Sequence, residues 1–214
     1  MTECGTGAAI RSTRRYDYSR LAELHSSEFE GYFLARLGRD LLELYYETVI
    51  DFGQVGVVSE EDGELTGFAA GIDKAFEFYR KLIQRKGLRF FASLTRPVLR
   101  NPRVLISITG RLLERGSEKI DPGRRVAHLS YIAVVREKRG TGTAVRLLEG
   151  FKEEARARGF DTIEVETDAD NRCARQFYER EGFVVDREFS TGGGRSMVAY
   201  RCFDAHSSAD EAAN

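Results

Sequence analysis

Cysteine is scarce and scattered in this chain. The only three are Cys4, Cys173 and Cys202. They are too few and too widely spaced for a disulfide framework or for a cysteine-based metal knuckle. Their odd number fits a reducing compartment. We therefore expect a cytoplasmic protein without a metal site.

Long apolar runs are also missing. No uninterrupted run reaches the roughly 18 residues that a membrane-spanning helix needs, and residues 1–10 lack the apolar centre of a signal peptide. The formal net charge is −1, so the charge of the whole chain indicates neither an acidic nor a basic partner. Any contact with a membrane is therefore expected to be peripheral.

The chain does contain enough apolar residues for a core. Of its 214 residues, 42% are hydrophobic and 31% are charged, so it can bury a core and stay dissolved. This length suits one generous domain with an insertion. We expect a single domain over residues 1–204, with a helical insertion at about 74–120. The small, polar residues 205–214 are expected to form a disordered tail.

The pattern of apolar residues predicts an α+β (mixed α/β) fold. Apolar spacings of three and four predict helices, and alternating or β-branched stretches predict strands. The expected order is a strand at 8–14, helices at 16–29 and 34–52, strands at 54–59 and 65–72, helices broken at Gly87, Pro97 and Pro102, a strand at 126–135, a helix at 143–158, a strand at 162–167, a helix starting at Asn171, and strands at 183–186 and 197–203. A hairpin before the insertion and strand–helix units after it are typical of this class.

A glycine-containing loop joins the strand at 126–135 to the helix at 143–158. Gly140 and Gly142 allow the backbone to approach a ligand, and the start of the helix offers unpaired N–H groups and a positive dipole end. These features favour a pyrophosphate. No Walker sequence is present, and a dinucleotide fingerprint fails because position 145 is Val. A plain connector with two glycines is the remaining alternative.

Two stretches of this region resemble the GNAT family of N-acetyltransferases. Arg139-Gly140-Thr141-Gly142-Thr143-Ala144 is similar to the family signature [QR]-x-x-G-x-[GA], and Ile132-Ala133-Val134 precedes it. Residues 171–183, NRCARQFYEREGF, are similar to the family run N-x-x-A-x-x-[FL]-Y-x-x-x-G-F. The resemblance is specific over residues 126–186 and looser over 8–72.

The resemblance implies a splayed mixed sheet flanked by helices, with acetyl-CoA between the strands at 126–135 and 162–167. The pantetheine arm is expected to pair with the backbone of Ile132, Ala133 and Val134. The pyrophosphate is expected on the backbone amides of Arg139, Gly140, Thr141, Gly142, Thr143 and Ala144. Asn171 is expected to cap a helix, and the family's residue at this position faces the cofactor.

The implied reaction is direct attack of an amine on the acetyl thioester, without a covalent enzyme intermediate. Tyr178 matches the family's tyrosine and is the candidate acid for the departing thiolate; the alternative is a core aromatic residue. The strand before the loop has no carboxylate, so His128 and Glu166 are the candidate bases. Strand alternation predicts that His128 and Ser130 share a face. The N–H of Ala133 or Val134 is a candidate to polarise the thioester carbonyl.

The insertion is strongly basic. Residues 74–115 contain eleven Lys and Arg residues and two Glu, a net charge of +9 in a chain whose net charge is −1. One interpretation is a lid over an anionic acceptor, such as a nucleotide-linked amino sugar or a lipid-linked sugar. Another is a helical surface that lies on an anionic membrane. A third is a solvated helical insertion packed on the domain. A nucleic acid is not expected, because RNA recognition favours aromatic platforms on a sheet.

These observations lead to one main hypothesis and two alternatives. The main hypothesis is acetyl transfer from acetyl-CoA to a primary amine of a small or carbohydrate-type acceptor. The alternatives are acetylation of a protein lysine or N-terminus, and a non-catalytic acyl-CoA-binding module. The sequence leaves open whether the chain forms a homodimer.

Overall fold

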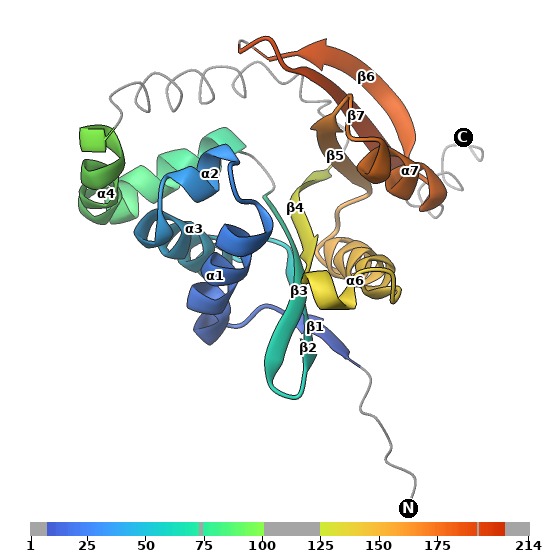
Figure 1. The fold of residues 1–214 in the computed structure, drawn as a ribbon, viewed down its shortest axis with the longest axis horizontal. Coiled ribbons are helices and arrows are strands. Elements are labelled where there is room, and N and C mark those ends of the chain that lie inside the picture. The colour runs from blue at the N-terminus through green and yellow to red at the C-terminus, as the bar shows by residue number, and fades with distance from the viewer. Residues whose placement is uncertain (1–7, 73–74, 101–124, 192, 204–214) are drawn as a thin grey trace, which may run out of the picture.

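The computed structural model describes residues 8–72, 75–100, 125–191 and 193–203. Figure 1 shows a sheet that fans out across the molecule, with helices on both of its faces. The elements are β1 (Ala9–Ser12), α1 (Tyr18–Glu28), α2 (Phe33–Arg36), α3 (Arg39–Asp51), β2 (Gly56–Glu61), β3 (Glu64–Ile72), α4 (Ala75–Arg100), β4 (Val126–Val134), α6 (Thr143–Ala157), β5 (Thr162–Asp168), α7 (Arg172–Arg180), β6 (Val184–Ser190) and β7 (Ser196–Phe203). The expected mixed α+β class is confirmed.

Within the described residues, seven strands form one sheet in the order β1-β2-β3-β4-β5-β7-β6. Only β4 and β5 pair in parallel, because α6 connects them, and every other neighbouring pair is antiparallel. The expected β2–β3 hairpin is present. Its turn holds Asp62 and Gly63 at φ 52° and 81°, the left-handed pair that a two-residue hairpin favours.

The two halves of the sheet separate between β4 and β5. The parallel pairing runs only from Val126–Thr162 to Leu129–Val165. Beyond it, residues 130–134 of β4 and 166–168 of β5 continue without pairing with each other, and we call this divergence the fork. The predicted splayed mixed sheet is therefore confirmed.

A β-bulge lies where the fork begins. On β3, Ala70 pairs with Tyr131 and the next residue, Gly71, pairs with Leu129, so Ser130 is the extra residue on β4. A bulge bends its strand and increases the local twist. It also breaks the regular alternation on which the prediction of a shared face for His128 and Ser130 depends.

The two faces of the sheet have separate apolar cores. On one face, called the α6 face, α6 and α7 cover β4, β5 and β7 through residues such as Leu147, Phe151 and Val165. On the other, called the α1 face, α1 and α3 cover β2, β3 and β4 through residues such as Leu42 and Phe68. Figure 1 shows α1 and α6 on opposite sides of β3 and β4. The fork therefore opens between two differently built layers.

The helical part of the insertion differs in detail from the prediction. Helix α4 is kinked at Lys86, whose φ of −129° is not helical, so the break expected at Gly87 is confirmed within one residue. Pro97 does not end the helix, which continues to Arg100. Burial of Leu94 and partial burial of Val98 against α3 hold this last turn in place despite the hydrogen bond lost at the proline.

The helix expected over 34–52 is divided into α2 and α3. Gly38 separates them with φ 95°, a conformation that ends one helix and lets the chain turn into the next. No helix among the described residues is long and apolar enough to cross a membrane. Pro102, the rest of the insertion to residue 120 and the tail at 205–214 lie outside the described residues.

Gly71 provides a test of the bulge. A Cβ added here would run into the carbonyl oxygen of His128 and would lie 2.6 Å from Cζ of Phe151. Because backbone on one side and a core ring on the other leave no room, Gly71→Ala is expected to lower the free energy of unfolding by about 1–3 kcal/mol. Urea unfolding measures the change. Gly87→Ala is the control, since its Cβ would meet only Cγ2 of Ile83 at 4.0 Å; equal stability of both variants with the native protein would contradict this packing.

Candidate active site

The loop before α6 has the backbone shape that the sequence predicts for a phosphate site. Gly140 and Gly142 both have positive φ, 78° and 82°, and α6 begins directly after Gly142. The first helical bond runs from Arg146 N–H to the carbonyl of Gly142, so the amides of residues 143–145 precede the hydrogen-bonded ladder. Thr141 Oγ1 donates to the carbonyl of Lys138 at 2.7 Å and fixes the loop. Nothing lies within 4 Å of a Cβ placed on either glycine.

The basic side chains of this loop are already engaged. Arg139 pairs with Glu28 of α1, and its Nε donates to the carbonyl of Val134 at 3.2 Å. Lys138 pairs with Glu61 of β2. Their charges are therefore largely neutralised, so backbone amides and the helix dipole, rather than these side chains, are suited to hold a phosphate.

The strand that leads into this loop presents backbone groups to the fork. Val135 N–H donates to the carbonyl of Thr66 in β3. Backbone N–H groups alternate between the two sides of a strand. The N–H of Ala133 therefore also points toward β3, whereas the N–H groups of Ile132 and Val134 point toward β5. Of the two candidate polarising amides, Val134 is therefore the one directed into the fork.

These features fit the group that the resemblance implies. Ile132 and Val134 offer backbone hydrogen bonds to an extended pantetheine arm along β4, and residues 140–144 offer amides to its pyrophosphate. The described residues contain no group of three or more His, Cys, Asp or Glu side chains arranged to hold a metal ion.

Tyr178 lies in the core of the α6 face. Its side chain is buried, and its ring lies 5.5 Å from that of Phe183 and 6.1 Å from that of Tyr200. Burial raises the pKa of the Tyr178 phenol well above its usual value, so the hydroxyl stays protonated near neutral pH. The residue therefore has the properties of a core aromatic side chain and also those of a hydrogen-bond donor.

Helix α7 holds Tyr178 in a fixed position. As predicted, Asn171 caps the helix, and its side chain accepts a hydrogen bond from Ala174 N–H at 3.2 Å. Arg175 Nε donates to the hydroxyl of Tyr200 at 3.0 Å, and that hydroxyl donates to Glu179 at 2.8 Å. These bonds join α7 to β7 through the single hydroxyl of Tyr200.

A charged cluster lies on the α1 face where β4 and β5 begin to separate. Its centre is Glu164, whose side chain is only 3% exposed and accepts hydrogen bonds from Arg187 Nη2 and Arg201 Nε, both at 3.0 Å. His128 Nδ1 lies 3.7 Å from Oε1 of Glu164. Arg187 Nη2 also donates to Oε1 of Glu166 at 3.1 Å. The structure thus brings together the two candidate bases through residues that sequence reasoning had missed.

Glu164 itself is poorly suited to accept a proton. Burial alone would raise the pKa of its carboxyl group, but the hydrogen bonds and positive charges of Arg187, His128 and Arg201 hold that pKa below its usual range. Glu164 therefore stays ionised and organises its neighbours. Glu166 follows Val165, the last residue of β5 that pairs with β4, so it stands at the start of the fork.

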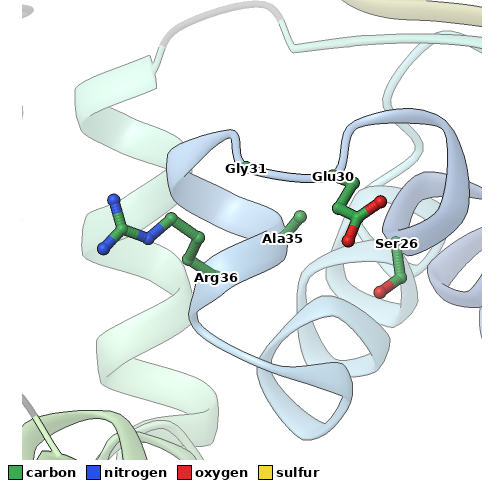
Figure 2. A pocket seen from close by; sticks show the side chains of 5 residues that line it. All are labelled: Ser26, Glu30, Gly31, Ala35 and Arg36. Carbon is green, nitrogen blue, oxygen red and sulfur yellow. The ribbon is translucent and has the colours of Figure 1, made fainter.

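The hairpin between β6 and β7 is fixed to the end of β5 through Arg195. Arg195 Nε donates to Asp168 at the end of β5 at 3.0 Å. Figure 2 shows an open pocket at the α1–α2 connection, lined by Ser26, Glu30, Gly31, Ala35 and Arg36.

His25 on α1 is a buried titratable group that the sequence analysis did not identify. Its Nδ1 lies 2.7 Å from the hydroxyl of Tyr46, and Nε2 is buried without a hydrogen-bond partner among the described residues. The rings of Phe29, Phe68 and Tyr131 surround it. Burial lowers the pKa of His25 to about 4, so the imidazole is neutral in the folded protein. The only sequence feature that could have indicated a buried His25 is the helical spacing of the apolar residues around it.

The family model described as "Acetyltransferase (GNAT) family" matches residues 18–183, which include the loop before α6, the fork and α7. The chain therefore belongs to the GNAT family of acetyltransferases. By its family the chain is an acetyltransferase.

One known relative is similar in sequence to a short part of the chain. N-alpha-acetyltransferase 30 of Schizosaccharomyces pombe is 39% identical over 56 residues, which are 26% of this chain and 37% of that protein. The match thus spans little more than a third of that relative's length.

Two solved structures have the same fold over most of the chain. A Salmonella typhimurium protein assigned as an acetyltransferase, solved with its cofactor acetyl-CoA, has a TM-score of 0.60 at 17% identity, covering 94% of this chain and 96% of that one. Ribosomal-protein-alanine N-acetyltransferase from Brucella melitensis has a TM-score of 0.61 at 15% identity, covering 92% and 99%.

The depressed pKa of His25 predicts an acid-sensitive fold. The His25 imidazole binds a proton near pH 6.5 in the unfolded chain but only near pH 4 in the folded protein. The free energy of unfolding therefore falls as the pH decreases through this window. Between pH 7 and pH 5, the free energy of unfolding of the native protein should fall by about 2 kcal/mol more than that of His25→Gln, because the glutamine side chain cannot titrate. Urea unfolding at the two pH values measures the difference. Tyr46→Phe keeps the buried imidazole and should retain the native dependence; an unchanged dependence in His25→Gln would contradict the account.

Proposed function

We propose that this enzyme acetylates the α-amino group of a polypeptide N-terminus. The observation that carries the proposal is the charged cluster of His128, Glu164, Glu166 and Arg187 on the α1 face, where the fork opens. A cationic ammonium group needs carboxylates to attract it and a base to deprotonate it before it can attack a thioester. The cluster offers both beside the strand expected to carry the donor.

In this proposal the donor and the acceptor approach from opposite faces of the sheet. Acetyl-CoA supplies an activated thioester when it is bound. Residues 140–144 hold its pyrophosphate, and Ile132 and Val134 hold its arm. The Val134 N–H polarises the carbonyl that is attacked, and the amine arrives from the α1 face. The protein thereby contributes proximity and orientation, which are worth several orders of magnitude in rate.

Glu166 is the proposed proton acceptor, with His128 as the second proton-accepting group. Glu166 stands beyond the last β4–β5 pair, and Arg187 orients its carboxylate through the 3.1 Å hydrogen bond. His128 lies one strand away, with its Nδ1 3.7 Å from Oε1 of Glu164. Either group can lose its proton to solvent through the open side of the fork.

Tyr178 is the proposed partner of the departing sulfur. Its raised pKa makes it a weak acid, so its main contribution is a hydrogen bond that stabilises the thiolate charge as it forms. The rigid attachment of α7 to β7 through Arg175 and Tyr200 supports this role, because a hydrogen bond to a transition state requires a fixed donor.

The acceptor class is supported by similarity. The relatives named N-alpha-acetyltransferase 30 and ribosomal-protein-alanine N-acetyltransferase act, by their names, on α-amino groups. A small or carbohydrate-type amine with negative charge is the second candidate, favoured by the basic side chains of α4.

An acceptor panel combined with Glu166→Gln tests both parts of the proposal. Thiol release from acetyl-CoA should be fastest with peptides that have a free N-terminus, and slow with N-blocked lysine peptides or a nucleotide-linked amino sugar. Glu166→Gln should lower kcat/KM for the best acceptor about a hundredfold, because a positioned base contributes that much, without changing the Kd for acetyl-CoA. Glu188→Gln, on the exposed side of β6, is the matched control.

Different outcomes overturn different parts of the proposal. Preference for the amino sugar would replace the acceptor class with the second candidate. Full activity of Glu166→Gln together with loss of activity in His128→Gln would move the base to His128. Absence of thiol release with every amine would overturn the acceptor proposal altogether.

A further inference from the structure

Helix α4 is fixed to the molecule along one side only. Phe78, Leu82, Phe90 and Leu94 are buried, three of them in a small core shared with α3. Lys86 reaches Asp51 at 2.8 Å and Arg89 reaches Glu47 at 2.8 Å, so ion pairs to α3 reinforce this attachment. Figure 1 shows α4 on the outer side of α2 and α3, remote from β6 and β7.

The free side of the helix carries large apolar residues. Leu88, Phe91 and Leu99 are 88%, 61% and 84% exposed. They follow the kink at Lys86 and lie three and eight residues apart, a helical spacing that puts them, with Thr95, in a single stripe along the helix. Three such side chains in one stripe are unusual for a surface that faces water alone, and we call it the α4 stripe.

Positive charge accompanies the α4 stripe. Arg89 and Arg96 are exposed and lie one and eight residues after Leu88, so they form the neighbouring row on the helix. Arg80, Lys81 and Arg85 are exposed on the turns before the kink. From residue 78 to residue 100 the sequence contains no Asp or Glu. An apolar stripe beside a row of cations is the pattern of a helix that lies in the surface of an anionic bilayer.

We propose that α4 docks this enzyme on an anionic lipid surface, with Leu88, Phe91 and Leu99 entering the acyl boundary and exposed cations such as Arg96 contacting the headgroups. A nucleic acid would match the charge, but phosphate contacts leave three exposed apolar side chains without a role. A membrane accommodates both features at once. Docking in this way keeps the enzyme at the bilayer surface without any spanning helix.

The absence of tryptophan from the chain allows a direct test. Phe91→Trp places a single indole in the α4 stripe, and Tyr16→Trp places one at a site of nearly equal exposure, 59%, before α1. The full chain is mixed with phosphatidylcholine vesicles with or without phosphatidylglycerol, at low and high salt. The Phe91→Trp emission should shift to the blue only with phosphatidylglycerol at low salt, and Tyr16→Trp should not shift.

Vesicle sedimentation supplies the quantitative measurement. Binding to vesicles with phosphatidylglycerol should exceed binding to neutral vesicles by about tenfold or more at low salt. Replacing Leu88, Phe91 and Leu99 together with Ser should remove most of it, whereas Val184→Ser with Val185→Ser, two exposed apolar residues of β6, should leave it intact. Equal binding to neutral and anionic vesicles, no binding at low salt, or stronger binding to an RNA duplex than to vesicles would each overturn the proposal.

Discussion

The close contact between Gly71 and the carbonyl of His128 is the constraint on which the rest of the site depends. Only a glycine lets β3 approach β4 this closely at the bulge, with Phe151 of α6 packed on the other side. The bulge places one extra residue on β4 at the point where its pairing with β5 stops. A single local irregularity thus separates two strands of an otherwise continuous sheet.

Several properties of the enzyme follow from that separation. The amides of Ile132 and Val134 face the fork instead of a neighbouring strand, so they remain available to a ligand. The same bend leads into the loop at Gly140 and Gly142, which ends at the start of α6. On the α1 face, the buried Glu164 holds Arg187 and Arg201 beside His128, and Arg187 reaches Glu166. In the proposed mechanism, acetyl-donor binding and amine chemistry are therefore served by different faces of the same strands.

The parts of the site encoded in short stretches of sequence were predictable. The glycines before α6, the Asn171 cap and the alternation of Ile163 and Val165 with Glu164 and Glu166 all leave local patterns, and the structure agrees with each. The bulge at Ser130 leaves none. Contacts between distant residues, such as Arg139 with Glu28 and His25 with Tyr46, were also missed, because they depend on how the layers pack. The helix break predicted at Pro97 was wrong for the same reason, because packing on α3 outweighs the loss of the helical hydrogen bond at the proline.

The central claim is that acetyl-CoA lies in the fork, along the β4 backbone and on the loop before α6. Backbone amide NMR during titration with acetyl-CoA tests it most directly. The account predicts the largest shift changes at the amides of Ile132, Val134, Gly140 and Gly142, with small changes in β1 and β2. Saturable binding that leaves those four amides unchanged, or that instead moves residues at the far end of the sheet, would contradict it.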